Sequence, residues 1–136
     1  RKVNARAIAA GRCAVQQASV AELPFEAEQF EVVTAFETVY FWPELAQNFR
    51  EVYRVLKPGG YWFIKMNPYY SKEELESFEY KNAGNNIYEK DHIMRLRQAT
   101  TNYWKEKFAR FGKEIIYLEF EYPWQEGMNR LFVYQS

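Results

Sequence analysis

The hydrophobic and polar positions of the first 36 residues predict a helix, two strands and a loop. Residues 1–10 are rich in alanine, and Gly11 follows where a glycine commonly ends a helix. Residues 12–18 alternate between apolar and polar side chains, which predicts a strand. Residues 22–29 predict a loop. Residues 30–36 are nearly continuous apolar, which is typical of a strand buried on both faces.

An amphipathic helix and a further strand are predicted next. Proline is favoured as the first helical residue because its missing N–H is not needed there, so we expect this helix to begin at Pro43. Pro58 ends the helix, Gly59 and Gly60 allow a tight turn, and residues 61–66 form the next predicted strand. The apolar side chains that recur at helical spacing are Leu45, Phe49, Val52 and Leu56.

Two further helices are predicted in the second half of the chain. Ser71 and Glu74 have the spacing of a capping box at the start of a short helix, which residues 82–86 interrupt. A longer helix is predicted over residues 91–111. Its apolar stripe consists of Ile93, Leu96, Thr100, Tyr103, Trp104, Phe108 and Phe111.

The last part of the chain predicts a β-hairpin. Residues 114–122 and 130–135 are rich in β-branched and aromatic side chains, and the turn residues 123–129 separate them. The alternation of strands and helices upstream favours an open, mostly parallel sheet covered on both faces. We therefore predict an α/β fold in a single domain, with one antiparallel edge near the C-terminus.

Composition and charge narrow the classes of function. Aromatic residues make up 19% of the chain, which indicates a core of packed rings or an apolar cleft or association surface. Lys and Arg number 18, as do Asp and Glu, so no basic face for a nucleic acid is expected. Cys13 is the single cysteine and excludes an internal disulfide. His92, the single histidine, has no partners for a metal site. No apolar run suggests a membrane span and no signal peptide is visible, so we expect a cytoplasmic protein.

Two motifs carry a resemblance to a known family. The first is Arg54-Val55-Leu56-Lys57-Pro58-Gly59-Gly60, and the second is Leu23-Pro24-Phe25 followed by Phe30-Glu31-Val32-Val33-Thr34. Together they resemble the second half of a class I S-adenosylmethionine-dependent methyltransferase, most like the ubiquinone/menaquinone-biosynthesis type. The resemblance implies a doubly wound Rossmann-like sheet in which strand seven lies antiparallel between strands five and six. It identifies residues 12–18 as strand three, 30–36 as strand four and 61–66 as strand five.

The resemblance also implies where S-adenosylmethionine would bind. Ser19 stands where many relatives have an acidic residue that accepts a hydrogen bond from the adenine amine, and a hydroxyl can accept that bond without the charge. The backbone N–H groups of Val20 and Ala21 would face the adenine ring. Phe36, Glu37 and Thr38 would lie beside the methionine part, and Glu37 is either a ligand of its ammonium group or a solvated loop carboxylate.

The acceptor site is expected at the carboxyl ends of strands four and five, where ligands of open α/β sheets gather. Many relatives carry a histidine pair after strand four, whereas this chain has aromatic residues there, so no catalytic base is predicted. The acceptor would be a small organic molecule, apolar or aromatic. The residues predicted to contact it are Tyr40, Phe41, Trp42, Asn67 and Tyr69.

The family's glycine-rich loop has no counterpart here, since no G-x-G sequence occurs in the chain. We therefore expect residues 1–136 to form a partial methyltransferase domain that lacks the first two strands. Strand four would then have an unpaired edge, which favours association with another chain. A missing N-terminal segment or a homodimer would complete the sheet. The isolated chain is expected to be inactive or weakly active.

Two rival hypotheses come from other classes. The first is a non-catalytic association module that reuses half of the methyltransferase fold, dimerises and has no cofactor affinity. The second is a half-domain that binds a nicotinamide-type nucleotide, which the absence of a dinucleotide fingerprint disfavours.

Overall fold

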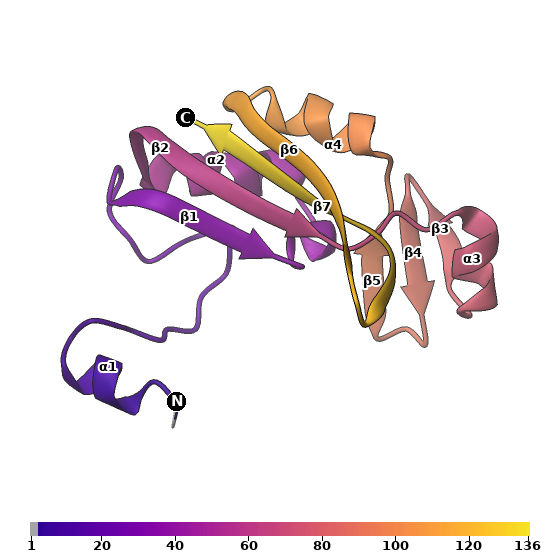
Figure 1. Cartoon of the computed structure of the whole chain (residues 1–136), viewed down its shortest axis with the longest axis horizontal. Helices are drawn as coiled ribbons and strands as arrows, with labels where there is room; N and C mark the ends of the chain where they lie inside the picture. The colour runs from indigo at the N-terminus through magenta and orange to yellow at the C-terminus, as the bar shows by residue number, and fades with distance from the viewer. Residues whose placement is uncertain (1–2) are drawn as a thin grey trace.

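The computed structural model describes residues 3–136 and arranges them as two sheets with helices beside them (Figure 1). The larger sheet has four strands in the order β1-β2-β7-β6, and the smaller has three in the order β3-β4-β5. The strands of the larger sheet are β1 (Phe30–Phe36), β2 (Leu56–Met66), β6 (Lys113–Tyr122) and β7 (Gln125–Gln135). Those of the smaller sheet are β3 (Lys81–Gly84), β4 (Ile87–Lys90) and β5 (Met94–Arg97). The helices are α1 (Ala5–Ala9), α2 (Leu45–Val55), α3 (Lys72–Ser77), α4 (Thr101–Phe108) and the 3-10 helix η1 (Val39–Phe41).

The segment before β1 confirms one prediction and corrects another. Gly11 follows α1 with a φ of 69°, as expected for a glycine that ends a helix. The predicted strand over residues 12–18 is wrong, because these residues contain no strand and only an isolated bridge, Ser19 to Glu22, follows them. A strand needs a neighbour for its backbone hydrogen bonds, and none lies beside this segment among residues 3–136. Residues 1–2 of the predicted helix lie outside the described part.

The parallel unit β1–α2–β2 confirms the strand predicted at residues 30–36 and contains the one predicted at 61–66. β2 already begins at Leu56, so α2 ends at Val55, before Pro58. β1 pairs parallel with β2, for example Thr34 with Phe63. The helix begins at Leu45 instead of Pro43, with Glu44 in the N-cap position. β1 is also not buried on both faces as expected, since alternate side chains along it are exposed.

The hairpin β6–β7 confirms the predicted strand order. β7 lies between β2 and β6 and runs antiparallel to both. The hairpin turn is shorter than predicted because β7 already begins at Gln125. With β1 and β2 as its one parallel pair, the larger sheet is mixed in the described part of the chain, and the expectation of a mostly parallel sheet is wrong there.

The long helix predicted over residues 91–111 is reduced to its second half. α4 begins after Thr100, whose side chain accepts a hydrogen bond from the Tyr103 N–H at 3.3 Å. Residues 94–97 form β5 and pair antiparallel with β4. Asp91 and His92 both have positive φ in the turn between β4 and β5, so neither caps a helix. The apolar residues that suggested one helix belong in part to the small sheet and in part to α4.

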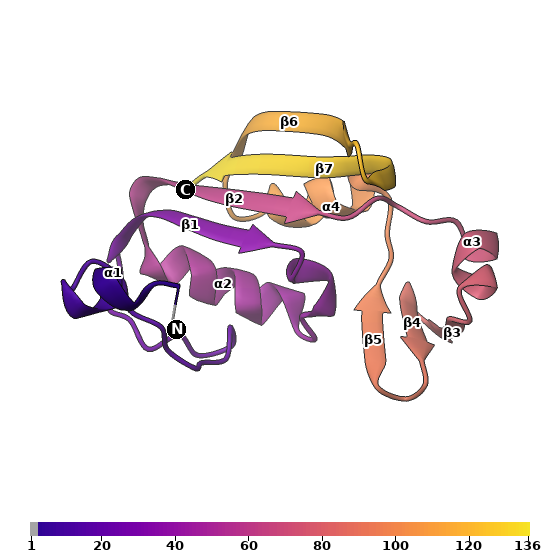
Figure 2. The ribbon, with the colours of Figure 1, turned by 60° about the horizontal axis from the view of Figure 1, so that its bottom comes forward.

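The core lies on one face of the larger sheet. α2 and α4 pack on the same side of it (Figure 2), and fully buried rings of Phe49, Trp62, Trp104 and Phe108 meet between them and the strands. This arrangement buries most of the large aromatic side chains of the two helices.

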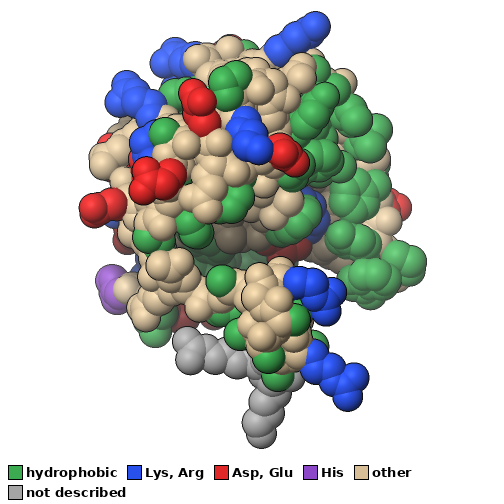
Figure 3. Space-filling model, turned by 90° about the vertical axis from the view of Figure 1, so that its left-hand side faces the viewer, with side chains coloured by type: hydrophobic (Ala, Val, Ile, Leu, Met, Phe, Trp, Pro, Cys, Tyr) green, Lys and Arg blue, Asp and Glu red, His purple; other side chains and the backbone are tan. Residues whose placement is uncertain are grey.

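The opposite face of the sheet is left uncovered by the described residues. The strand register places Val32, Phe36, Tyr61, Ile116 and Leu118 on this face, and each is 38–57% exposed. Figure 3 shows hydrophobic side chains gathered along this side of the molecule, at the right of the view. We call these five residues the uncovered face. β1 is the edge strand beside it.

Gly59 and Gly60 lie in β2 just before Tyr61, where its continuous pairing with β1 begins, and they have a testable role. Gly59 has a φ of 78°, where an alanine costs about 1–2 kcal/mol. Gly59→Ala is therefore expected to lower the free energy of unfolding in urea by about that amount, and Gly59→Asn by less. A Cβ at Gly60 would lie 2.9 Å from the Lys57 carbonyl oxygen, so Gly60→Ala should also destabilise. An alanine at Gly59 with wild-type stability would contradict this account of the turn.

Candidate functional site

A cavity of about 280 Å³ lies where β1 and β2 end, between the larger sheet and the small one. Both parallel strands point their carboxyl ends toward the small sheet (Figure 1), which is the edge where open α/β sheets bind ligands. η1 follows β1 at this edge, and α3 and the small sheet close the other side. The cavity is lined by Tyr40, Phe41, Met66, Asn67, Pro68, Tyr70, Leu75, Phe78, Tyr80, Lys90, Met94, Leu96, Arg97, Gln98 and Arg130.

A chain of polar contacts runs along the strand ends to the cavity wall. Lys65 is only 5% exposed and forms an ion pair with Glu37. Its ammonium group also donates to the Asn67 Oδ1 at 3.2 Å, and the Asn67 Nδ2 donates to the Tyr40 hydroxyl oxygen at 2.8 Å. Burial, with Glu37 nearby, raises the pKa of Tyr40 far above its usual value, so the hydroxyl stays protonated.

Glu37 occupies a strained position at the end of β1. Its φ of 56° is in the left-handed region, and its N–H donates to the Lys65 carbonyl oxygen at 2.8 Å. Non-glycine residues in this region occur mainly where the surrounding structure holds them, often at functional sites. The carboxylate is about half exposed and faces the ammonium group of Lys65.

Two guanidinium groups add positive charge to the cavity wall. Arg130 is buried and donates to the carbonyl oxygens of Ala99 and Asn67 at 3.2 Å. Arg97 donates to the Trp42 carbonyl oxygen at 3.1 Å. Burial lowers the pKa of Arg130 from its usual high value.

The structure brings together three of the five residues predicted to contact an acceptor. Tyr40, Phe41 and Asn67 line the cavity, whereas Tyr69 lines an adjacent hollow of about 450 Å³. Trp42 does not line the cavity, because its ring packs in the core, stacked on Trp62 with centroids 6.1 Å apart. The residues of α3, the small sheet and β7 that line the cavity were not predicted from the sequence. The only feature that pointed to them was the abundance of aromatic residues.

The predicted cofactor residues divide into two groups. Phe36, Glu37 and Thr38 lie at the end of β1, and the Phe36 side chain is 57% exposed. Ser19 and Ala21 lie in a turn where the Ser19 Oγ accepts a hydrogen bond from the Ala21 N–H at 3.2 Å. That N–H is therefore already used within the turn. The role of these residues in binding stays a prediction.

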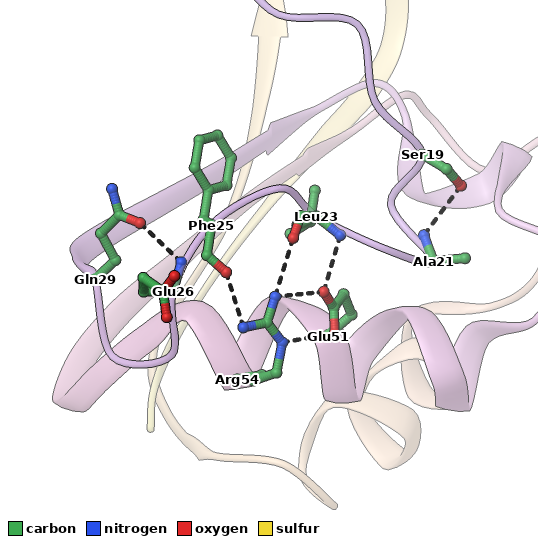
Figure 4. A network of polar contacts seen from close by, with 8 residues as sticks. All are labelled: Ser19, Ala21, Leu23, Phe25, Glu26, Gln29, Glu51 and Arg54. Carbon is green, nitrogen blue, oxygen red and sulfur yellow. Dashed lines mark hydrogen bonds and ion pairs between the residues drawn. The ribbon is translucent and has the colours of Figure 1, made fainter.

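A hydrogen-bond cluster joins the two sequence motifs into one unit (Figure 4). The Arg54 guanidinium donates to the carbonyl oxygens of Phe25 at 2.9 Å and Leu23 at 3.1 Å. The Glu51 carboxylate pairs with Arg54 and accepts from the Leu23 N–H at 2.8 Å. The end of α2 thus fixes the loop that leads from Ser19 into β1, which gives a physical reason for the two motifs to occur together.

The described residues contain neither a metal cluster nor a membrane-spanning helix. Within residues 3–136 no group of three or more His, Cys, Asp or Glu side chains could hold a metal ion. The helices of this part are all too short or too polar to span a bilayer.

Sequence comparisons match this chain to methyltransferases. A family model described as "Methyltransferase domain" matches residues 1–64. Sterol methyltransferase-like 3 of Botryococcus braunii is 28% identical over 132 residues, which cover 83% of this chain and 30% of that protein. Sterol 4-C-methyltransferase strm-1 of Caenorhabditis elegans is 36% identical over 72 residues, which cover 50% of this chain and 21% of that protein. The chain spans less than a third of the length of either relative.

Solved structures share the fold at low sequence identity. The PH0226 protein of Pyrococcus horikoshii superposes with a TM-score of 0.73 at 17% identity, covering 98% of this chain and 65% of that chain. The 1,6-didemethyltoxoflavin-N1-methyltransferase of Burkholderia thailandensis has a TM-score of 0.66 at 12% identity, covering 87% of this chain and 48% of that chain. That structure contains 1,6-didemethyltoxoflavin and S-adenosylhomocysteine.

Together these matches confirm the resemblance to class I S-adenosylmethionine-dependent methyltransferases. The family model covers residues 1–64, and the solved structures share the fold over most of the chain. The narrower likeness to the ubiquinone/menaquinone-biosynthesis type stays a prediction.

The cluster around Arg54 predicts a dependence of stability on pH. Hydrogen bonding to Arg54, and more weakly to Leu23, lowers the pKa of Glu51 below its unfolded value of about 4.3. The stabilisation is therefore complete above that pH and is lost as the pH falls through the lower folded pKa. Glu51→Gln should melt a few degrees below wild type at neutral pH, and the gap should narrow in acid.

Thermal unfolding at several pH values checks this expectation. Glu106→Gln, which changes an exposed glutamate of α4, is the matched control and should leave the melting temperature nearly unchanged at every pH. A gap between wild type and Glu51→Gln that is constant with pH would contradict the role of the ionised carboxylate.

Proposed function

We propose that this chain forms the acceptor side of a site for S-adenosylmethionine-dependent methyl transfer, as part of a larger or oligomer-completed domain. The observation that carries the proposal is the cavity of about 280 Å³ at the carboxyl ends of β1 and β2. Its volume is near the lower end of the range for small-molecule sites, and its wall combines aromatic rings with a few fixed polar groups. The acceptor would be a small organic molecule with an apolar or aromatic body.

The side chains at the end of β1 fit the methionine end of the cofactor. When bound, S-adenosylmethionine supplies the electrophilic methyl group. The half-exposed Glu37 carboxylate uses Oε1 for Lys65, and its Oε2 is available to accept from an ammonium group. The exposed Phe36 ring offers an apolar and cation-attracting surface beside it. The Ser19 hydroxyl would accept from the adenine amine.

The cavity residues would position the acceptor and exclude water. Tyr70, Phe78 and Leu96 supply apolar walls, which displace solvent around the reacting atom. Tyr40 is protonated at neutral pH and therefore serves as a hydrogen-bond donor and not as a base. Methyl transfer here depends on orientation of an already nucleophilic acceptor.

The names of similar proteins support an apolar acceptor. One similar protein is named a sterol 4-C-methyltransferase and another is named sterol methyltransferase-like, and a structural neighbour is named 1,6-didemethyltoxoflavin-N1-methyltransferase. Because the chain spans only part of each relative, their substrates serve as support for the acceptor class alone.

Calorimetric titration of the chain with S-adenosylhomocysteine tests the cofactor role. We expect measurable binding, with a Kd tighter than about 1 mM, equivalent to about −4 kcal/mol. Glu37→Gln should weaken it several-fold because the carboxylate that faces the ammonium group is lost. Glu31→Gln, on the same strand but paired with Lys57, is the matched control and should bind as wild type does.

No binding at millimolar ligand would contradict the cofactor role of this chain. It would favour the second candidate, a non-catalytic association module. The uncovered face is the observation that supports this candidate, since contiguous exposed apolar surface commonly marks an interaction site. The free edge of β1 adds unpaired backbone groups next to it.

The oligomeric state tests that second candidate. We expect the chain to self-associate in sedimentation velocity, because pairing two copies through the uncovered face removes apolar side chains from water. Phe36→Lys with Leu118→Lys should shift the population toward monomer. Ile93→Lys, at an 88% exposed position in the turn of the small sheet, is the control and should not. A monomeric wild-type chain at every concentration would contradict association through this face.

A further inference from the structure

Asn67 has its amide orientation fixed by a neighbour that can only donate. The Lys65 ammonium group has no lone pair, so the Asn67 oxygen must face it, as the 3.2 Å contact has it. The amide nitrogen therefore faces Tyr40, and it donates to the hydroxyl oxygen at 2.8 Å. The usual ambiguity between the two ends of an asparagine amide does not arise here.

This orientation determines which way the Tyr40 hydroxyl acts. Its oxygen already accepts from Asn67, so its own hydrogen is left to donate to another group. Among residues 3–136 no acceptor for that hydrogen is found, and Tyr40 lines the cavity. Tyr40 is half-buried, and a ligand oxygen in the cavity would accept this hydrogen bond where solvent is displaced.

The charges of the wall favour the same kind of ligand. The residues that line the cavity include Lys90, Arg97 and Arg130 but no aspartate or glutamate. Lys90 is paired with Glu79 at 3.2 Å. Arg97 and the buried Arg130 contact backbone carbonyl oxygens and form no ion pair with a carboxylate of the described residues. Glu119 is near enough to act on the charge of Arg130 but forms no ion pair with it, so an anion beside the guanidinium would stabilise it further.

We propose that the cavity selects an acceptor that joins an apolar ring body to an ionised oxygen, such as a carboxylate, phenolate or enolate. Tyr40 recognises this oxygen by donating a hydrogen bond. The Glu37–Lys65–Asn67 chain orients the Asn67 amide so that the Tyr40 hydroxyl acts as a donor. That this ligand is a methyl acceptor rests on the proposed function. The binding preference itself is independent of any cofactor.

Three probes of matched shape test the preference by calorimetry on the whole chain: naphthoate, methylnaphthalene and naphthylmethylammonium. Naphthoate should bind at least about tenfold more tightly than methylnaphthalene, since a hydrogen bond to an ionised oxygen contributes at least that factor. The ammonium probe should bind more weakly than both. Equal affinity for the three probes, or no binding of naphthoate at millimolar concentration, would overturn the proposal.

Two variants test the role of Tyr40. Tyr40→Phe should lower naphthoate affinity about tenfold and leave methylnaphthalene affinity unchanged. Asn67→Asp should cause at least the same loss, because an aspartate only accepts and would draw the Tyr40 hydrogen away from the ligand. Tyr61→Phe, on the uncovered face, is the control and should alter neither affinity.

The outcomes separate this inference from the proposed function. Equal losses for both probes in Tyr40→Phe would mean that Tyr40 only shapes the cavity, and the recognition role would be wrong. Selective naphthoate binding without S-adenosylhomocysteine binding would sustain the anion site while contradicting methyl transfer by this chain. Circular dichroism of each variant verifies that the fold is retained.

Discussion

The burial of one ring cluster around Trp62 is the constraint on which the rest of this structure depends. Trp62 lies fully buried in the centre of β2, with ring centroids of Phe49 at 5.1 Å and Phe108 at 5.5 Å. These rings come from β2, α2 and α4, so one cluster fixes both helices on one face of the sheet. Close-packed interiors tolerate little change in volume, which makes the relative positions of these elements well determined. The strand ends that form the cavity are positioned as a consequence.

The sequence predicted the elements whose signals are local. The strand over residues 30–36, the capping box at Ser71 and the strand order of the hairpin all follow from patterns within a few residues or from the family resemblance. The prediction failed where pairing with another strand decides the secondary structure. Residues 12–18 alternate as a strand does, yet they have no described neighbour, and residues 94–97 became a strand because β4 offered one. Tertiary context overrides local propensity in both cases.

The position of the cavity was predictable, but several of the residues that line it were not. Ligands gather at the carboxyl ends of strands, so Tyr40, Phe41 and Asn67 could be named from strand boundaries alone. Arg130 could not, because its contact with Asn67 joins residues 63 positions apart that no motif relates. The packing of Trp42 on Trp62 could not be predicted either, since a loop aromatic next to a site and one that turns back into the core look the same in sequence.

The uncovered face and the polar chain of the site are physically connected. The register places Lys65 on the same face as Phe36 and Leu118, beside the exposed apolar side chains. The Tyr122 ring shields its ammonium group, at 5.2 Å from the ring centroid. A partner that covered this face would remove water from around Glu37, and a lower local dielectric would strengthen its pairing with Lys65. A firmer ion pair holds Asn67 more rigidly, and through it Tyr40. Covering this face would therefore act on the cavity without contacting it.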